Sequence, residues 1–200
     1  MQSTDAPVLV SLIRHAESEW NASGRWQGHA DPPLSARGRQ QARELAERMA
    51  GARASILLCS DLQRAHQTAE PLAVALGIPL QIDPRLRELD VGRWSGLRRD
   101  EIEAVDPDGL VRFESGDPAF RPGAGESRRE IRARARRAIA HWIARQPEGR
   151  IVIVTHLGFI RALLPSEEPD NAGVVDVSAR DALTRRRIFD AQHPASNRSL

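Results

Sequence analysis

Residues 151–164 read IVIVTHLGFIRALL. The first five are β-branched and form a short run typical of a strand buried on both faces of a sheet. The rest has the length and spacing of a short helix, which Pro165 would end because proline cannot continue a helix. A buried strand that leads directly into a helix, with His156 at the junction, indicates an α/β protein.

The same alternation of strand and helix extends along the chain. Apolar or β-rich runs predict further strands at 8–13, 55–59, 80–82, 174–177 and 187–189. Helical spacing predicts one helix from Ser35 to Met49, one that begins at Ser60 or Asp61 and ends at Gly77, and one over 127–146. We therefore predict an α/β fold with a mostly parallel sheet that helices cover on both faces.

The 200 residues correspond to one domain, residues 1–200. Within it, Gly, Pro and Asp interrupt the pattern between about 83 and 122. Short helices and loops are expected there, as a small cap-like insertion over one end of the sheet.

Composition favours a globular protein of the cytoplasm. Hydrophobic residues make up 40% and charged residues 28% of the chain, and no apolar run approaches the roughly 18 residues of a membrane span. The first residues have no basic segment of the kind that begins a signal peptide. The single cysteine, Cys59, excludes an internal disulfide framework and a cysteine-built zinc site.

The basic pI does not indicate nucleic-acid binding. The 29 basic residues are all arginine and face 27 acidic ones, a net charge of only +2, and no lysine or tyrosine titrates below the arginine range. This small surplus is enough to raise the sequence pI to about 9.7. Residues 121–150 hold nine Arg and three Glu; we interpret them as a solvated helix face, with steering of anionic substrates or docking to an acidic partner as the alternative.

Charged and imidazole side chains follow four successive predicted strands. Arg14 and His15 come after the first strand, Arg64 lies early in the helix after the second, Glu88 follows the third, and His156 follows IVIVT. Because ligands of open α/β sheets bind at the carboxyl ends of the strands, we expect these five residues to form one site.

Arg64 suggests what this site binds. A cation in the first turn of a helix opposes the helix dipole, at a cost of roughly 0.3–1 kcal/mol. The arginine could instead turn to solvent or pair with Asp61. With Arg14 on the neighbouring strand, a phosphate held by helix amides and guanidinium groups is the more economical interpretation.

Five segments, in this order, resemble the motifs of the histidine phosphatase superfamily, the phosphoglycerate-mutase-like proteins. They are LIRHAESEWNASGRWQGHADPPLSARGRQQA, SDLQRAHQTAEPLA, LRELDVGRWSGL, PGAGES and IVTHLGFIRALL, and the resemblance covers about residues 8 to 164. It implies a three-layer αβα sandwich, in agreement with the pattern of strands and helices.

The resemblance also implies roles for the five residues. His15 would be the nucleophile and would form a phosphohistidine, kept neutral by Arg14 and Arg64. Arg14, Arg64 and His156 would hold the phosphoryl oxygens, and Glu88 would act as general acid and then general base. The neighbouring carboxylate Asp90 is the weaker candidate for this last role. No metal and no cofactor are expected.

Three further positions, Asn21, Gln27 and Gly28, match family positions that contact the phosphoryl group or the substrate. Their alternative role is to stabilise a loop. Trp26 and Trp94 flank these motifs and are interpreted as packing residues, with lining of the leaving-group pocket as the alternative.

The chain departs from the family pattern at Ala16 and Leu157, where glycine is usual, and its segment after Pro165 is short. The Leu157 side chain would crowd the pocket. A short GRWSG motif, residues 92–96, follows Glu88 in place of the longer insertion of true mutases, which favours the phosphatase branch.

These observations predict a metal-independent phosphomonoester hydrolase that acts through a phosphohistidine on a small phosphorylated metabolite. We expect it to bind neither nucleic acid nor membranes. The formation of a homodimer is possible and is left open. The alternatives are a cofactor-dependent phosphoglycerate mutase and a catalytically weak regulatory protein that binds a phosphorylated ligand. The identity of the substrate does not follow from the sequence.

Overall fold

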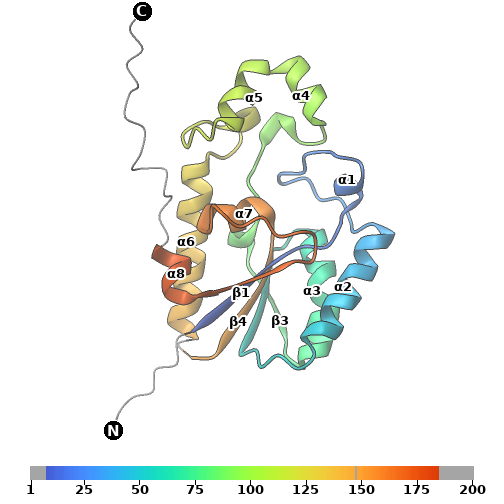
Figure 1. The fold of residues 1–200 in the computed structure, drawn as a ribbon, viewed down its shortest axis with the longest axis vertical. Coiled ribbons are helices and arrows are strands. Elements are labelled where there is room, and N and C mark those ends of the chain that lie inside the picture. Colours follow the sequence, from blue (N-terminus) through green and yellow to red (C-terminus); the bar gives the residue numbers. More distant parts are fainter. Residues whose placement is uncertain (1–7, 147, 185–200) are drawn as a thin grey trace, which may run out of the picture.

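The computed structural model describes residues 8–146 and 148–184, which form an α/β fold around one five-stranded sheet (Figure 1). The strand order is β3-β2-β4-β1-β5. The strands are β1 (Leu9–Arg14), β2 (Ile56–Cys59), β3 (Leu80–Ile82), β4 (Arg150–Thr155) and β5 (Val174–Ser178). The first four are parallel to their neighbours, and β5 runs antiparallel to β1 at the edge. The predicted mostly parallel sheet is confirmed.

Helices cover both faces of the sheet. Alternate residues of β4 point to opposite sides of the sheet. Ile151 and Ile153 pack with α6 (Arg128–Arg145), α7 (Leu157–Leu163) and α8 (Ala179–Thr184). Val152 and Val154 pack with α2 (Ala36–Met49) and α3 (Gln63–Leu76) on the other side. The two helical layers lie on either side of the sheet in Figure 1. This alternation, which follows from the two-residue period of a strand, gives the predicted three-layer sandwich.

Most helix ends follow the predicted signals. Ser35 and Ser127 cap α2 and α6 through their side chains, and Gly77 ends α3 with a left-handed φ of 66°. The predicted start of α3 was wrong: its N-cap is Leu62, without a side-chain cap. Asp61 cannot serve there because its carboxylate pairs with Arg87.

The segment from 83 to 122 consists of short helices and loops, as predicted. It contains α4 (Arg99–Val105), α5 (Pro107–Glu114) and two single-turn 3₁₀ helices, η1 (Pro84–Leu86) and η2 (Gly92–Trp94), and a third, η3 (Pro122–Ala124), begins at its last residue. The pair α4–α5 lies beyond the upper end of the sheet in Figure 1. The cap role of this segment stays a prediction.

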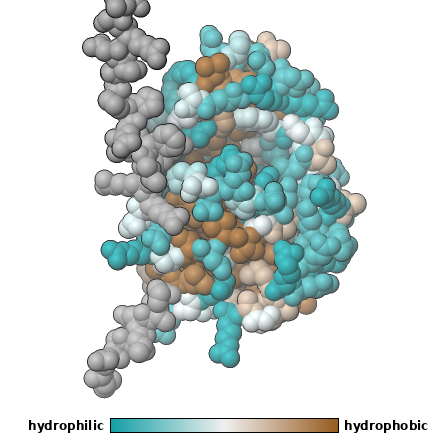
Figure 2. All heavy atoms as spheres, viewed as in Figure 1, coloured by the Kyte–Doolittle hydropathy of each residue, from teal (hydrophilic) through white to brown (hydrophobic). Residues whose placement is uncertain are grey.

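Two short helices were not predicted, α1 (Glu19–Ala22) between β1 and α2, and α8 after β5. The strand predicted at 174–177 is β5, whereas the one predicted at 187–189 lies outside the described residues. Between residues 8 and 184, position 147 aside, no helix is long and apolar enough to cross a membrane. Figure 2 shows a largely hydrophilic face, with hydrophobic side chains gathered in its lower centre.

Candidate active site

The two histidines meet because their strands are neighbours. β1 and β4 pair in parallel with Arg14 opposite Thr155, so the residues that follow, His15 and His156, leave the same edge of the sheet side by side. Their ring centroids are 5.1 Å apart. The sheet thus brings these two predicted residues together at the carboxyl ends of its strands.

The His15 ring is held in one tautomer. It is only 3% exposed, and its Nδ1 lies 2.7 Å from the backbone oxygen of Ala16. A carbonyl oxygen can only accept a hydrogen bond, so Nδ1 carries the proton and Nε2 of the neutral ring keeps its lone pair. Burial, followed by the nearby charge of Arg64, holds the pKa of His15 well below 6.5. His15 is therefore neutral at neutral pH, and the lone pair of its ring lies on Nε2.

Arg64 is completely buried, which excludes a solvent-facing side chain. Its Nη1 donates to the backbone oxygen of Ala30 at 2.8 Å and its Nη2 to that of Gly28 at 2.9 Å, while Asp61 is engaged elsewhere. Burial lowers the pKa of Arg64 to about 10, and the charge of Glu88 opposes this shift. The guanidinium stays charged at neutral pH beside the histidines.

Several buried nitrogens of this site have no hydrogen-bond partner among the described residues. They are the Nε atoms of Arg14 and Arg64 and both ring nitrogens of His156. Arg14 does bind elsewhere, since its Nη1 donates to the backbone oxygen of Pro169 at 3.0 Å. Buried polar atoms are nearly always satisfied in native proteins. Two guanidinium Nε atoms and an imidazole ring without protein partners point to a small anion as their ligand.

Glu88 places a carboxylate in the same site. Its Oε1 accepts the backbone N–H of Leu89 at 2.8 Å, and its charge acts on both Arg14 and Arg64. A Cβ atom added to Gly158, early in α7, would collide with Oε1. The absence of a side chain at Gly158 therefore gives Glu88 its position, which sequence reasoning had not recognised.

The neighbouring carboxylate has a different environment. Asp90 Oδ1 accepts the backbone N–H of Gly92 at 2.9 Å, as in a turn, and its backbone oxygen accepts from Glu126. The Asp90 carboxylate thus stabilises the turn at Gly92, whereas the charge of Glu88 acts on Arg14 and Arg64.

Arg134 organises the loop that carries Glu88. Its Nη1 donates to the backbone oxygens of Arg85 and Arg87, both at 2.8 Å, and its Nη2 to that of Glu88 at 3.0 Å. Its guanidinium also pairs with the Glu126 carboxylate. The side chain is 17% exposed, so the interpretation of 121–150 as a solvated face is wrong for this residue.

A sequence signal for Arg134 existed. It stands three residues after Ile131 and four before Ala138, in line with the buried stripe of α6. An arginine on an apolar stripe requires a buried partner, and here the partners are loop carbonyls and Glu126.

The other predicted contact residues brace the loop after His15. Asn21 Oδ1 accepts the backbone N–H of Ser18 at 3.1 Å, and Gln27 Oε1 accepts the Ser18 hydroxyl at 2.8 Å. Gly28 offers its carbonyl to Arg64 and has a φ of +50°. A role of these three residues in binding substrate stays a prediction.

One more residue of this region was missed. Asn171 Nδ2 donates to the backbone oxygen of His15 at 3.1 Å. The segment after Pro165, although short, therefore supports the His15 backbone.

The two tryptophans pack, as interpreted from the sequence. Trp94 is 2% exposed and donates through Nε1 to Asp106, and its ring lies 5.5 Å from that of Trp26. Phe113 and Phe120 complete this aromatic cluster, which joins the 83–122 segment to the main core.

A neutral buried imidazole beside two guanidinium groups and a carboxylate, at the carboxyl edge of a parallel sheet, is the arrangement of a phosphoryl-transfer site that uses histidine. The sequence profile of the histidine phosphatase superfamily (branch 1) matches residues 10–168, and the chain belongs to this family. The prediction of a histidine phosphatase is thereby confirmed.

Relatives of this chain carry two kinds of name. Glucosyl-3-phosphoglycerate phosphatase of Mycobacterium tuberculosis is 35% identical over 160 residues, which span 76% of this chain and 71% of that protein. A probable phosphoglycerate mutase GpmB of an Enterobacter species is 39% identical over 150 residues, 74% and 69% of the two chains. A solved structure of the mycobacterial phosphatase with VO3 superposes with a TM-score of 0.80, at 31% identity, over 85% of this chain and 90% of that one.

Gly158→Ala tests the placement of Glu88. Alanine favours a helix by up to about 1 kcal/mol over glycine, so stability should not fall. The new Cβ displaces the Glu88 carboxylate, and we expect kcat to fall about tenfold or more. Steady-state kinetics and thermal unfolding measure the two effects.

The matched control for this variant is the Glu88→Gln background. There, Gly158→Ala should cost little further activity, because both changes act on the same group. Fully additive losses would show that Gly158 acts in another way.

The buried histidines predict a specific pH behaviour. Because burial lowers the pKa of His15 and His156, their Cε1–H NMR signals should not move between pH 8 and 6.5. In the chain unfolded in urea, histidines titrate near 6.5. Below that pH the unfolded chain binds more protons than the folded one, so stability should fall as the pH decreases. Titration midpoints near 6.5 in the folded protein would contradict this assignment.

Proposed function

We propose that this protein hydrolyses phosphomonoesters through a phosphohistidine on Nε2 of His15. The observation that carries the proposal is the neutral, buried His15 beside three groups with partnerless buried nitrogens: the Nε atoms of Arg14 and Arg64, and both ring nitrogens of His156. This set offers a nucleophile and an anion site at one place.

The reaction has two steps. In the first, the Nε2 lone pair attacks phosphorus, the ester P–O bond breaks, and Glu88 gives its proton to the departing oxygen. In the second, water attacks the phosphohistidine, Glu88 takes a proton from that water, and the P–N bond breaks. The guanidinium groups of Arg14 and Arg64, with His156, hold the three equatorial oxygens, where charge accumulates in the transition state.

The relatives support a small phosphorylated substrate. The mycobacterial relative is named a glucosyl-3-phosphoglycerate phosphatase, and solved structures of it contain VO3 or inorganic phosphate. We propose that this chain forms a single domain, acts in the cytoplasm and needs no metal. Gel filtration would show whether it forms a homodimer.

Mutase activity is the second candidate, because other relatives are named probable phosphoglycerate mutases. Incubation with 3-phosphoglycerate and a trace of 2,3-bisphosphoglycerate separates the two. Hydrolysis releases free phosphate, whereas a mutase forms 2-phosphoglycerate with little release.

Rapid quenching of the reaction tests the proposal. With p-nitrophenyl phosphate and EDTA present, we expect turnover and an acid-labile, base-stable phosphate on the peptide that contains His15. His15→Ala should abolish both, whereas His66→Ala, a matched change on the outer part of α3, should preserve both. Near-normal turnover by His15→Ala, or activity that EDTA removes and Mg²⁺ restores, would overturn the mechanism.

A further inference from the structure

His29 joins the loop that follows His15 to the loop that carries Glu88. Its Nε2 lies 2.8 Å from the backbone oxygen of Glu88, which is 59 residues further along the chain. Because a carbonyl oxygen can only accept a hydrogen bond, Nε2 carries a proton and donates it. His29 is partly buried. One imidazole thus connects two loops that come together at the site.

The backbone oxygen of Glu88 also accepts a second donor, Nη2 of Arg134 at 3.0 Å. A carbonyl oxygen has two lone pairs, so His29 and Arg134 together satisfy it. Arg134 binds the carbonyls of Arg85 and Arg87 as well, and therefore holds the loop as a whole. His29 binds this loop at the Glu88 carbonyl, which makes its contribution to Glu88 easier to isolate.

The peptide between Glu88 and Leu89 transmits this restraint to the carboxylate. The C=O and N–H of a trans peptide lie in one plane and point in opposite directions. The N–H of Leu89, directed away from the two donors, binds Oε1 of the Glu88 side chain at 2.8 Å. A rotation of this plane would carry the N–H away from Oε1. The donors on the carbonyl therefore fix the group that holds the carboxylate.

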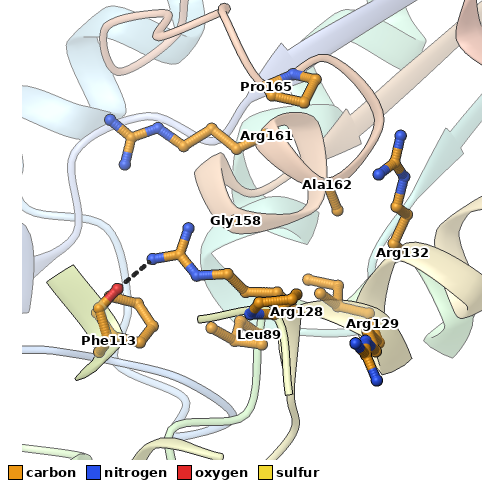
Figure 3. A pocket seen from close by; sticks show the side chains of 11 residues that line it. Leu89, Phe113, Arg128, Arg129, Arg132, Gly158, Arg161, Ala162 and Pro165 are labelled. Carbon is orange, nitrogen blue, oxygen red and sulfur yellow. Dashed lines mark hydrogen bonds between the residues drawn. The ribbon is translucent and has the colours of Figure 1, made fainter. Parts of the chain in front are cut away.

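Open space adjoins this peptide. Leu89 and Gly158 border a pocket of about 480 Å³ (Figure 3). A Cβ atom added to Gly158 would lie 3.3 Å from Cβ of Leu89, so the two residues are neighbours. Beside a pocket, hydrogen bonds rather than close packing must hold the peptide plane.

His29 is itself held by the arginine of the anion site. The residues on either side of it, Gly28 and Ala30, offer their backbone oxygens to Arg64 at 2.9 and 2.8 Å. Arg64 is completely buried, so its guanidinium has little freedom to move. The backbone at His29 is thus fixed to Arg64, and its side chain to the peptide of Glu88.

We propose that His29 is a positioning residue, which sets the direction of the Glu88 carboxylate relative to a phosphoryl group held at Arg64. The inference rests on the proposed hydrolase, in which Glu88 is the general acid. The hydroxyl oxygen of a carboxylic acid is its weaker acceptor, so the N–H on Oε1 directs the acidic proton to Oε2. A general acid must lie within hydrogen-bond reach of the leaving oxygen. Loss of the His29 contact would turn Oε2 away from that oxygen.

Three substitutions separate the hydrogen bond from the rest of the side chain. His29→Leu removes the donor and keeps an apolar side chain. His29→Gln restores it, because the amide nitrogen of glutamine is as many bonds from Cα as Nε2 of histidine. His29→Asn is the matched polar control, since its amide nitrogen is one bond too close to Cα.

The burst rate of phosphoryl transfer to His15 is the measurement, with two kinds of substrate. One is p-nitrophenyl phosphate, whose leaving group needs no proton. The other is the fastest substrate of an alkyl phosphate panel that includes glycerol 3-phosphate and 3-phosphoglycerate. With the alkyl phosphate, we expect His29→Leu and His29→Asn to be about 3- to 10-fold slower, the range of one hydrogen bond. With p-nitrophenyl phosphate all variants should stay within about twofold of the wild type, and His29→Gln should do so with both substrates.

Two controls separate positioning from a general effect on the fold. On the Glu88→Gln background, His29→Leu should cost little further activity, because both changes act on the same group. His66→Leu, a matched change on the outer part of α3, should leave both burst rates unchanged. Thermal unfolding shows which variants are folded, and the comparison of His29→Gln with His29→Asn remains if the leucine variant does not fold.

The results distinguish this inference from the proposed function. Equal losses with both substrates, additive losses on the Glu88→Gln background, or equal rates of His29→Gln and His29→Asn would overturn the role of His29 and leave the hydrolase intact. Absence of any phosphohistidine burst in the wild type, with every substrate of the panel, would instead reject the hydrolase.

Discussion

Arg64 buries a positive charge at the carboxyl end of the sheet, where removing an ion from water is unfavourable by several kcal/mol. Two backbone oxygens, of Gly28 and Ala30, and the charge of Glu88 offset this cost. The same cation keeps His15 neutral, and its hydrogen bonds fix the loop that follows His15. His15, Glu88 and the loop after His15 thus all interact with one buried guanidinium, which joins segments far apart in the sequence.

The loop that carries Glu88 is held from two sides. Arg134 of α6 fixes its backbone through three carbonyl oxygens, and Gly158 of α7 leaves space for its carboxylate. The arginine-rich helix therefore has two different roles. Arg134 binds the loop that carries Glu88, whereas Arg128, at the start of the same helix, lines a pocket together with Leu89 and Gly158.

Much of the fold could be predicted because its signals are local. Runs such as IVIVT identify strands, and Ser35, Gly77 and Ser127 mark helix ends. The convergence of Arg14, His15, Arg64, Glu88 and His156 could be predicted because they come after parallel strands, whose carboxyl ends lie at one edge of the sheet. Three further residues could not be predicted, because their contacts join distant segments of the chain. Arg134 binds a carbonyl oxygen 47 residues away, Gly158 leaves space for the Glu88 carboxylate, and Asn171 binds the backbone of His15. The predicted start of α3 was wrong because Asp61, a predicted N-cap, binds Arg87 instead.

In the proposed mechanism, Glu88 protonates the leaving group as phosphate moves to His15. The pre-steady-state burst of phosphoryl transfer tests this step in the wild type and in Glu88→Gln, with an alkyl phosphate and with p-nitrophenyl phosphate. We expect the variant to lose about 10²- to 10⁴-fold with the alkyl phosphate, whose leaving oxygen needs a proton, and far less with p-nitrophenyl phosphate. Asp90→Asn should show no such dependence. Equal losses of Glu88→Gln with both substrates would show that Glu88 is not the acid.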